Sequence, residues 1–78
     1  MHHPPMPAED VLARRRAIGN RIRDARLHAN LTQEAVALRA GIRIATYSRI
    51  ENGHASPVLD TLIRIADALD VPLRDLVE

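Results

Sequence analysis

The sequence contains no cysteine, lysine, phenylalanine or tryptophan, and it has a single tyrosine. Without cysteine, neither disulfides nor thiolate metal sites hold the fold together. Proteins that bind single-stranded nucleic acids stack the bases on aromatic rings, so the lack of aromatics argues against that class of ligand. No apolar run is long enough to cross a bilayer, and we therefore expect a cytoplasmic protein without membrane contact.

With 78 residues, the chain has room for one small domain, because a single core needs most of such a length. Ala, Leu, Ile and Val supply nearly all of the 46% apolar residues, which favours an aliphatic core between packed helices. The net charge is only +1, but it is unevenly distributed: residues 1–30 carry +3, residues 31–56 carry +1 and residues 57–78 carry −3. The N-terminal part of the chain is therefore basic and the C-terminal part is acidic.

The N-terminal residues 1–7 contain three prolines and two histidines, which predicts a disordered tail before a domain spanning residues 8–78. The histidine pair alone is not expected to bind a metal. From residue 8 to residue 29 the apolar residues repeat on one helical face, namely Val11, Ile18, Ile22, Ala25 and Ala29. Gly19 weakens this first helix by about 1 kcal/mol relative to alanine, so residues 8–17 are either part of it or a separate turn.

Turn and cap residues separate a second and a third helix from the first. Asn30 tolerates the left-handed conformation that ends a helix. Thr32 is a good N-cap for a helix over residues 33–40, and Gly41 suits the sharp turn after it. A third helix over residues 44–51 follows, and an Asn-Gly turn signal ends it.

The C-terminal part predicts two more helices. Ser56 and Pro57 are typical of the N-cap and the first residue of a fourth helix, which ends near Asp70. Pro72 opens a short last helix. Strand patterns are missing, so the expected fold class is all-α, a compact bundle of five helices.

The central stretch from Leu31 to Gly53, LTQEAVALRAGIRIATYSRIENG, has the features of two helices joined by a tight turn. Ala37 allows a close helix crossing, Gly41 makes the turn, and Ile50 seats the second helix of the pair on the first. With SPVLDTLIRIADALDV following, the chain resembles the helix-turn-helix of the Cro and phage-repressor type, the xenobiotic-response-element (XRE) family of bacterial regulators, over about residues 18–76. The resemblance implies a lambda-repressor-like domain whose third helix lies in the DNA major groove.

The resemblance also assigns roles to individual residues. The base-facing positions are Arg43, Ile44, Ala45, Ser48 and Arg49, where arginine suits guanine and small apolar groups suit the thymine methyl. The phosphate-contacting positions are Gln33, Asn52 with the backbone N–H groups of its turn, and more weakly Thr46 and His54. DNA is thus the expected partner, and no cofactor is implied.

Two residues depart from the family pattern. Arg43 stands where a small hydroxyl residue often caps the third helix, so the first N–H groups lose that partner. Tyr47 stands where Ile or Val is usual; its ring packs in the core with the hydroxyl at the rim, or it contacts phosphate. The resemblance further suggests a partly buried ion pair between Arg26 and Glu51, the alternative being two solvated charges. The arginines at 14–16 form a solvated helix face or a supplementary phosphate contact.

Together these features predict a sequence-specific double-stranded DNA-binding transcriptional regulator, a repressor or controller. One module of this size reads few base pairs, so we expect a homodimer on two half-sites. The dimer candidates are Ile63, Leu73, Leu76 and Val77, which serve equally well as core. Two alternatives remain: an antitoxin that binds a toxin protein and its own promoter, and a DNA-independent adaptor. No catalytic constellation is present, so an enzyme is not expected; the protein should be bacterial and nucleoid-associated when bound to DNA.

Overall fold

The computed structural model describes the backbone of residues 7–78 and the side chains from Asp10 onwards. This part of the chain forms α1 (Pro7–His28), α2 (Gln33–Ala40), α3 (Ile44–Glu51), α4 (Leu59–Leu69) and α5 (Arg74–Val77). It contains no strand, in agreement with the predicted all-α class. None of these helices has the length and apolar character needed to cross a membrane.

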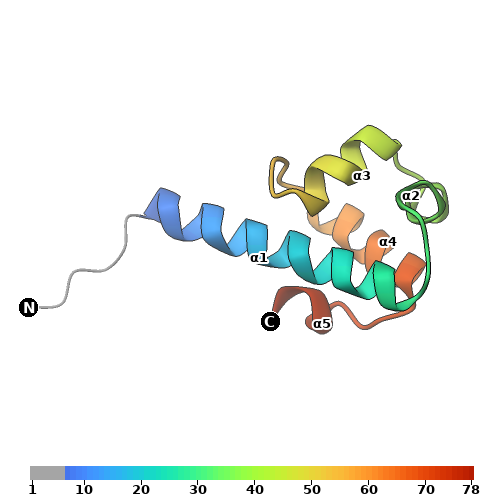
Figure 1. Ribbon diagram of the computed structural model, residues 1–78. Coiled ribbons are helices and arrows are strands. Elements are labelled where there is room, and N and C mark those ends of the chain that lie inside the picture. Colours follow the sequence, from blue (N-terminus) through green and yellow to red (C-terminus); the bar gives the residue numbers. More distant parts are fainter. Residues whose placement is uncertain (1–6) are drawn as a thin grey trace, which may run out of the picture.

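Helix α1 is the longest element, and its N-terminal half extends beyond the rest of the bundle (Figure 1). It runs through Gly19 without a break, so residues 8–17 are continuous with the first helix. It begins at Pro7, a residue that costs nothing at the first helical position because the N–H there has no partner in any helix. Pro7 thus belongs to α1, and residues 1–6, which make up the rest of the predicted tail, lie outside the described part.

Most of the predicted caps are present. Asn30 has φ of 56° and ends α1 in the left-handed conformation. The Thr32 side chain accepts a hydrogen bond from Ala35 N at 3.1 Å and caps α2. Gly41 follows α2 with φ of 71°, which glycine adopts without a steric penalty. Arg43 precedes α3 without a side-chain cap, as its departure from the family pattern predicts.

The predicted start of the fourth helix is wrong by two residues. Helix α4 begins at Leu59 with Val58 as its N-cap, and Ser56 and Pro57 lie in the extended segment before it. Pro57 is half-buried and lines a pocket together with residues of α1. Similarly, α5 begins at Arg74 and not at Pro72. Asp70 ends α4 with φ of 56°, close to the predicted end.

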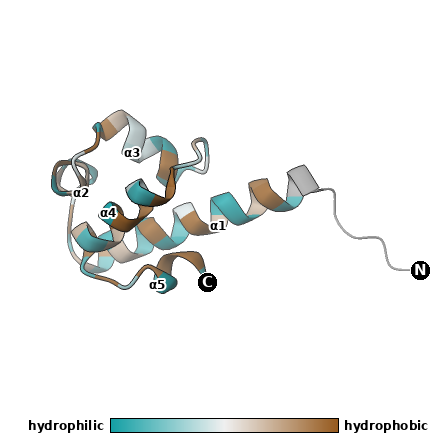
Figure 2. Cartoon of the chain, turned by 180° about the vertical axis from the view of Figure 1, so that it is seen from behind, coloured by the Kyte–Doolittle hydropathy of each residue, from teal (hydrophilic) through white to brown (hydrophobic). Residues whose placement is uncertain are grey.

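The core draws on every helix. Its fully buried apolar residues include Ile22 of α1, Val36 of α2, Tyr47 of α3, Ile65 of α4 and Leu76 of α5. Along α1, apolar bands alternate with polar ones, as an amphipathic helix on one side of a bundle requires (Figure 2). Burial of one stripe per helix fixes α3 against α1 and α2, and leaves the other side of α3 open.

Candidate nucleic-acid interface

Helix α3 has one buried and one exposed face. Tyr47, Ile50 and Glu51 are buried on the core side. The opposite side carries the residues predicted to read bases, and apart from half-buried Ser48 they are exposed: Arg43, Ile44, Ala45 and Arg49. Ile44 is 44% exposed, although a side chain of this size is usually buried. The α3 face therefore presents two arginines and small apolar groups to solvent, a combination suited to base edges and thymine methyl groups.

The two arginines of the α3 face differ in how they are held. Arg49 donates a hydrogen bond from Nη2 to the carbonyl oxygen of His54 at 3.2 Å. This contact directs the guanidinium towards the turn after α3, and its other N–H donors have no partner among the described residues. Arg43 makes no side-chain hydrogen bond in the described part of the chain and stands at the N-terminal end of α3. The two guanidinium groups thus mark both ends of the exposed face.

The turn after α3 shows that one predicted phosphate contact is wrong, namely the contact from its backbone N–H groups. The N–H of Asn52 donates to Ser48 O, that of Gly53 to Ile50 O, and that of His54 to Arg49 O. These three N–H groups close the end of the helix, so they are not available to a phosphate. The side chains of Asn52 and His54, as well as Thr46 in α3, remain exposed. Any contact from this turn must therefore come from a side chain.

An ion pair connects α1 to the end of α3. The Arg26 guanidinium donates from Nε to Glu51 Oε2 at 2.7 Å and from Nη2 to Oε1 at 3.1 Å. The Arg26 side chain is 12% exposed and that of Glu51 1%. The two residues are therefore not solvated surface charges. Arg26 Nη1 also donates to the carbonyl oxygen of Leu31, which links the pair to the segment before α2.

Gln33 shares the Glu51 carboxylate, an arrangement that the sequence did not predict. Its Nε2 donates to Glu51 Oε1 at 3.1 Å. A carboxylate only accepts hydrogen bonds, so the amide nitrogen must face inwards. One of the two N–H donors of that nitrogen remains for another acceptor. The predicted phosphate contact from Gln33 is compatible with this geometry, but the side-chain amide has only this one N–H donor left for it.

Tyr47 lies deeper than predicted. Its side chain is fully buried, and the hydroxyl is inside the core and not at the rim. The hydroxyl oxygen makes no hydrogen bond within the described part of the chain. Burial, together with the nearby Glu51 carboxylate, raises the pKa of Tyr47 above its usual range. The tyrosine therefore stays neutral, and a phosphate contact is excluded in this conformation.

Helix α1 approaches the end of α3 closely at Gly19. A Cβ atom on this residue would lie 2.5 Å from Glu51 O and 2.6 Å from Ile50 O. Both neighbours are backbone atoms, which cannot rotate away. The sequence signal was present, because a glycine inside a helical pattern often marks a packing contact. Helix propensity alone accounts only for the weakening of α1 at this residue.

Two arginines of α1 lie against the turn after α3. Arg15 donates from Nε to Gly53 O at 2.9 Å. The Arg16 side chain also packs on Gly53, since a Cβ there would lie 2.7 Å from Arg16 Cγ. Arg14 has a different environment: it pairs with Asp10 at 3.3 Å and is 78% exposed. The run at residues 14–16 is therefore not one uniform solvated face.

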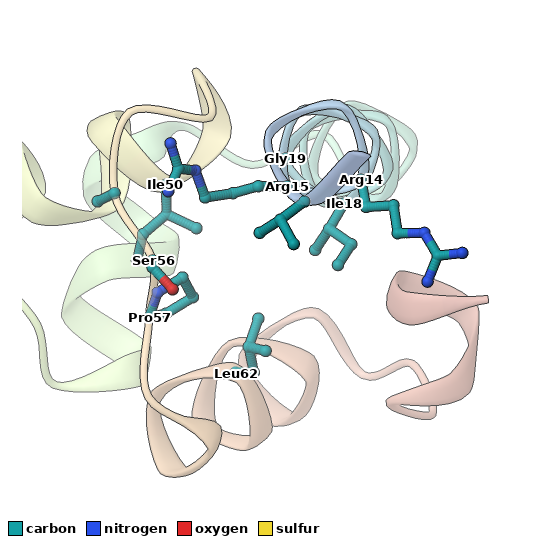
Figure 3. A pocket seen from close by; sticks show the side chains of 10 residues that line it. Arg14, Arg15, Ile18, Gly19, Ile50, Ser56, Pro57 and Leu62 are labelled. Carbon is teal, nitrogen blue, oxygen red and sulfur yellow. The ribbon is translucent and has the colours of Figure 1, made fainter. Parts of the chain in front are cut away.

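An apolar pocket of about 220 Å³ lies between α1, the segment after α3, and α4. Ile18, Ile50, Pro57 and Leu62 contribute to its lining. Figure 3 shows Arg15 reaching across its rim to the segment after α3, whereas Arg14 points towards α5. The polar lining residues of the pocket are Arg14, Arg15 and Ser56. Among the described residues, no three His, Asp or Glu side chains are grouped to hold a metal ion.

The fold and the exposed α3 face define a helix-turn-helix domain. The family model described as Helix-turn-helix matches residues 22–76, and the chain belongs to this family, of the XRE or Cro and phage-repressor type. Members of the family are non-enzymatic transcriptional regulators that bind DNA. The matched residues include all of α2, α3 and α4.

Individual relatives agree with this assignment. The chain is 34% identical over 59 residues to the cryptic phage CTXphi transcriptional repressor RstR of Vibrio cholerae, covering 76% of this chain and 53% of that protein. It is 45% identical over 53 residues to the antitoxin HigA1 of Mycobacterium tuberculosis, covering 68% of this chain and 36% of HigA1. The chain thus spans about half the length of RstR.

A solved structure matches nearly end to end. The restriction-modification controller protein C.AhdI of Aeromonas hydrophila superposes with a TM-score of 0.77 at 28% identity. The match covers 87% of this chain and 97% of C.AhdI. The compact five-helix fold is therefore that of a lambda-repressor-like helix-turn-helix domain.

Proposed function

We propose that this protein is a sequence-specific double-stranded DNA-binding repressor or controller that inserts α3 into the major groove. The exposed α3 face carries this proposal, because it offers base-reading chemistry on a helix held rigidly from behind. Arg43 and Arg49 bind guanine, whereas Ile44 and Ala45 contact thymine methyl groups. Half-buried Ser48 reads a base through its hydroxyl.

The phosphate contacts come from residues around this face. Gln33 uses its remaining N–H donor at the start of α2. The exposed side chains of Thr46, Asn52 and His54 contact the backbone of the duplex near α3 and its turn. Such contacts orient the protein on DNA and carry no sequence information of their own.

Selection from random duplexes with the purified protein, followed by two alanine variants, tests this assignment. Arg49→Ala should cost roughly 1–3 kcal/mol and relax preference at one position of the selected motif. Gln33→Ala should weaken binding to all sequences alike, because it removes a phosphate contact. Binding is measured by fluorescence anisotropy. A wild-type protein that selects no motif, or an Arg49→Ala variant with an unchanged motif, would contradict the assignment.

We further propose a homodimer, since two half-sites supply the affinity and specificity that one small module lacks. The burial of the four residues predicted for the dimer interface narrows the choice among them. Leu76 is fully buried and is not available to a partner, whereas Leu73 packs against the core but is only partly buried. Ile63 is 40% exposed and Val77 42%, and these two are the exposed candidates. Sedimentation at micromolar concentration should show a dimer, at least with operator present; a monomer in both conditions would rule it out.

An antitoxin is the second candidate function, favoured by the similarity to HigA1. Such a protein would bind its own promoter through α3 and a toxin through another surface. Co-purification with a small basic protein encoded by a neighbouring gene would support it. The salt dependence of duplex binding distinguishes a DNA-independent adaptor from a DNA regulator. An adaptor binds no duplex at any salt concentration, whereas the affinity of a regulator for DNA falls steeply between about 50 and 200 mM salt.

A further inference from the structure

We propose that α1 carries a second DNA-binding surface, the α1 basic stripe, formed by Arg16 and Arg23. Its ligand is the phosphate backbone of the duplex flanking the groove that α3 enters. The inference rests on the proposed function and extends it to α1. Of the two arginines, Arg16 lies before the segment that the family model matches, residues 22–76.

The spacing of the two arginines places them on one side of α1. They are seven residues apart, which is nearly two helical turns, so their side chains leave the helix in nearly the same direction. Asn20 lies between them, and Arg23 Nη2 donates to its Oδ1 at 2.7 Å. All three residues are exposed. In the described part of the chain neither guanidinium forms an ion pair with a carboxylate, so both charges are available to an anion.

Contacts with the α3 end place this stripe beside the candidate interface. The Arg16 side chain packs on Gly53, which stands between the exposed phosphate candidates Asn52 and His54. The hydrogen bond from Arg15 to Gly53 O holds α1 against the same turn. Three residues further along α1, Gly19 touches the backbone of Glu51. The stripe is therefore fixed next to the end of α3, and α1 continues outward past it (Figure 1).

The opposite side of α1 provides a comparison of equal formal charge, although Arg14 there pairs with Asp10. Arg14 and Arg21 are also seven residues apart, but they line a groove with Val77 and Glu78 at the C-terminal end. Figure 3 shows Arg14 directed towards α5, and α5 lies across α1 from α3 (Figure 1). These two arginines carry the same charge on the same helix, without proximity to the α3 face. Their replacement shows the general effect of removing positive charge, whereas replacement of Arg16 and Arg23 also removes the proposed direct contacts.

The test compares Arg16→Gln/Arg23→Gln with Arg14→Gln/Arg21→Gln on a mixed-sequence duplex between about 50 and 200 mM salt. Each phosphate contact contributes about one unit to the slope of log affinity against log salt concentration. We expect the first double variant to lose about two units of slope, equally for the selected motif and for mixed sequence. The second should keep the wild-type slope.

The outcomes separate this proposal from the proposed function. Equal slopes for both double variants, whether reduced or unchanged, would overturn the α1 basic stripe while wild-type binding still stood. A wild-type protein without salt-dependent duplex binding would overturn both proposals. Melting temperatures show whether each variant is folded. If Arg16→Gln/Arg23→Gln were unfolded, the single variants would decide, each with an expected loss of about one unit of slope and none if the proposal is wrong.

Discussion

Replacement of Arg26 by alanine is expected to lower the free energy of unfolding by about 3 kcal/mol or more. The variant would leave the buried Glu51 carboxylate without its cation and remove the hydrogen bond to Leu31 O. Such a loss is a large share of the stability of a small domain. Thermal and urea unfolding measure it, and the melting temperature should fall by more than about 12 °C.

The control for this substitution is Arg23→Ala, in the same helix. Arg23 is exposed, and within the described residues its side chain bonds only to Asn20, so its removal should change stability by less than about 0.5 kcal/mol. Equal melting temperatures for Arg26→Ala and the parent would show that the ion pair does not stabilise the fold.

Acid should reduce the effect of Arg26→Ala. Burial tends to raise the pKa of Glu51, but hydrogen bonds from Arg26 and Gln33 outweigh it, and the pKa lies below its usual value of 4.5. A carboxylate with a lowered pKa stabilises the fold above its unfolded pKa, and this contribution is lost as pH falls through the folded pKa. The difference between variant and parent should therefore be full at pH 7 and shrink below about pH 4.5.

Gly19→Ala is expected to destabilise the domain by about 1–3 kcal/mol, although alanine is the better helix former. Propensity alone would predict a gain of about 1 kcal/mol. The new Cβ would instead meet the carbonyl oxygens of Glu51 and Ile50 at 2.5 and 2.6 Å, which forces α1 away from α3. The same shift would disturb the Arg26–Glu51 pair. Urea unfolding measures the sign and the size of the change.

Ala17→Gly calibrates this prediction. Ala17 is exposed in α1, two residues before Gly19, so glycine there should cost only the propensity term of about 1 kcal/mol. If Gly19→Ala were more stable than the parent, the close approach of α1 to α3 would not exist in solution. The structure predicts that both variants lose stability, although one replaces glycine by alanine and the other replaces alanine by glycine.

Local chemistry explains which elements the sequence could predict. Thr32, Asn30 and Gly41 fix their own backbone through capping or the left-handed conformation, so the ends of α1 and α2 followed from single residues. The spacing from Leu31 to Gly53 is a local property too, and the family followed from it. The start of α4 did not, because Ser-Pro is locally suited to a helix start, whereas in the fold both residues lie in the extended segment before α4, where Pro57 lines a pocket with residues of α1.

Burial across the bundle could not be read from the sequence. An apolar residue near the C-terminus is equally suited to core and interface, and only the packed helices showed that Leu76 is buried while Val77 is exposed. The same holds for Tyr47, whose hydroxyl lies in the core.

Five helices and the helix-turn-helix could be predicted from the sequence, because caps, turns and periodicity act over a few residues. The base-reading residues were assigned only through the family resemblance, and this assignment stays a prediction. The packed helices were needed to show that Glu51 also accepts a hydrogen bond from Gln33, that Gly19 lets α1 cross α3, and that Arg15 and Arg16 lie beside the turn after α3. These contacts join residues 18 to 38 positions apart, and their distances depend on how whole helices pack.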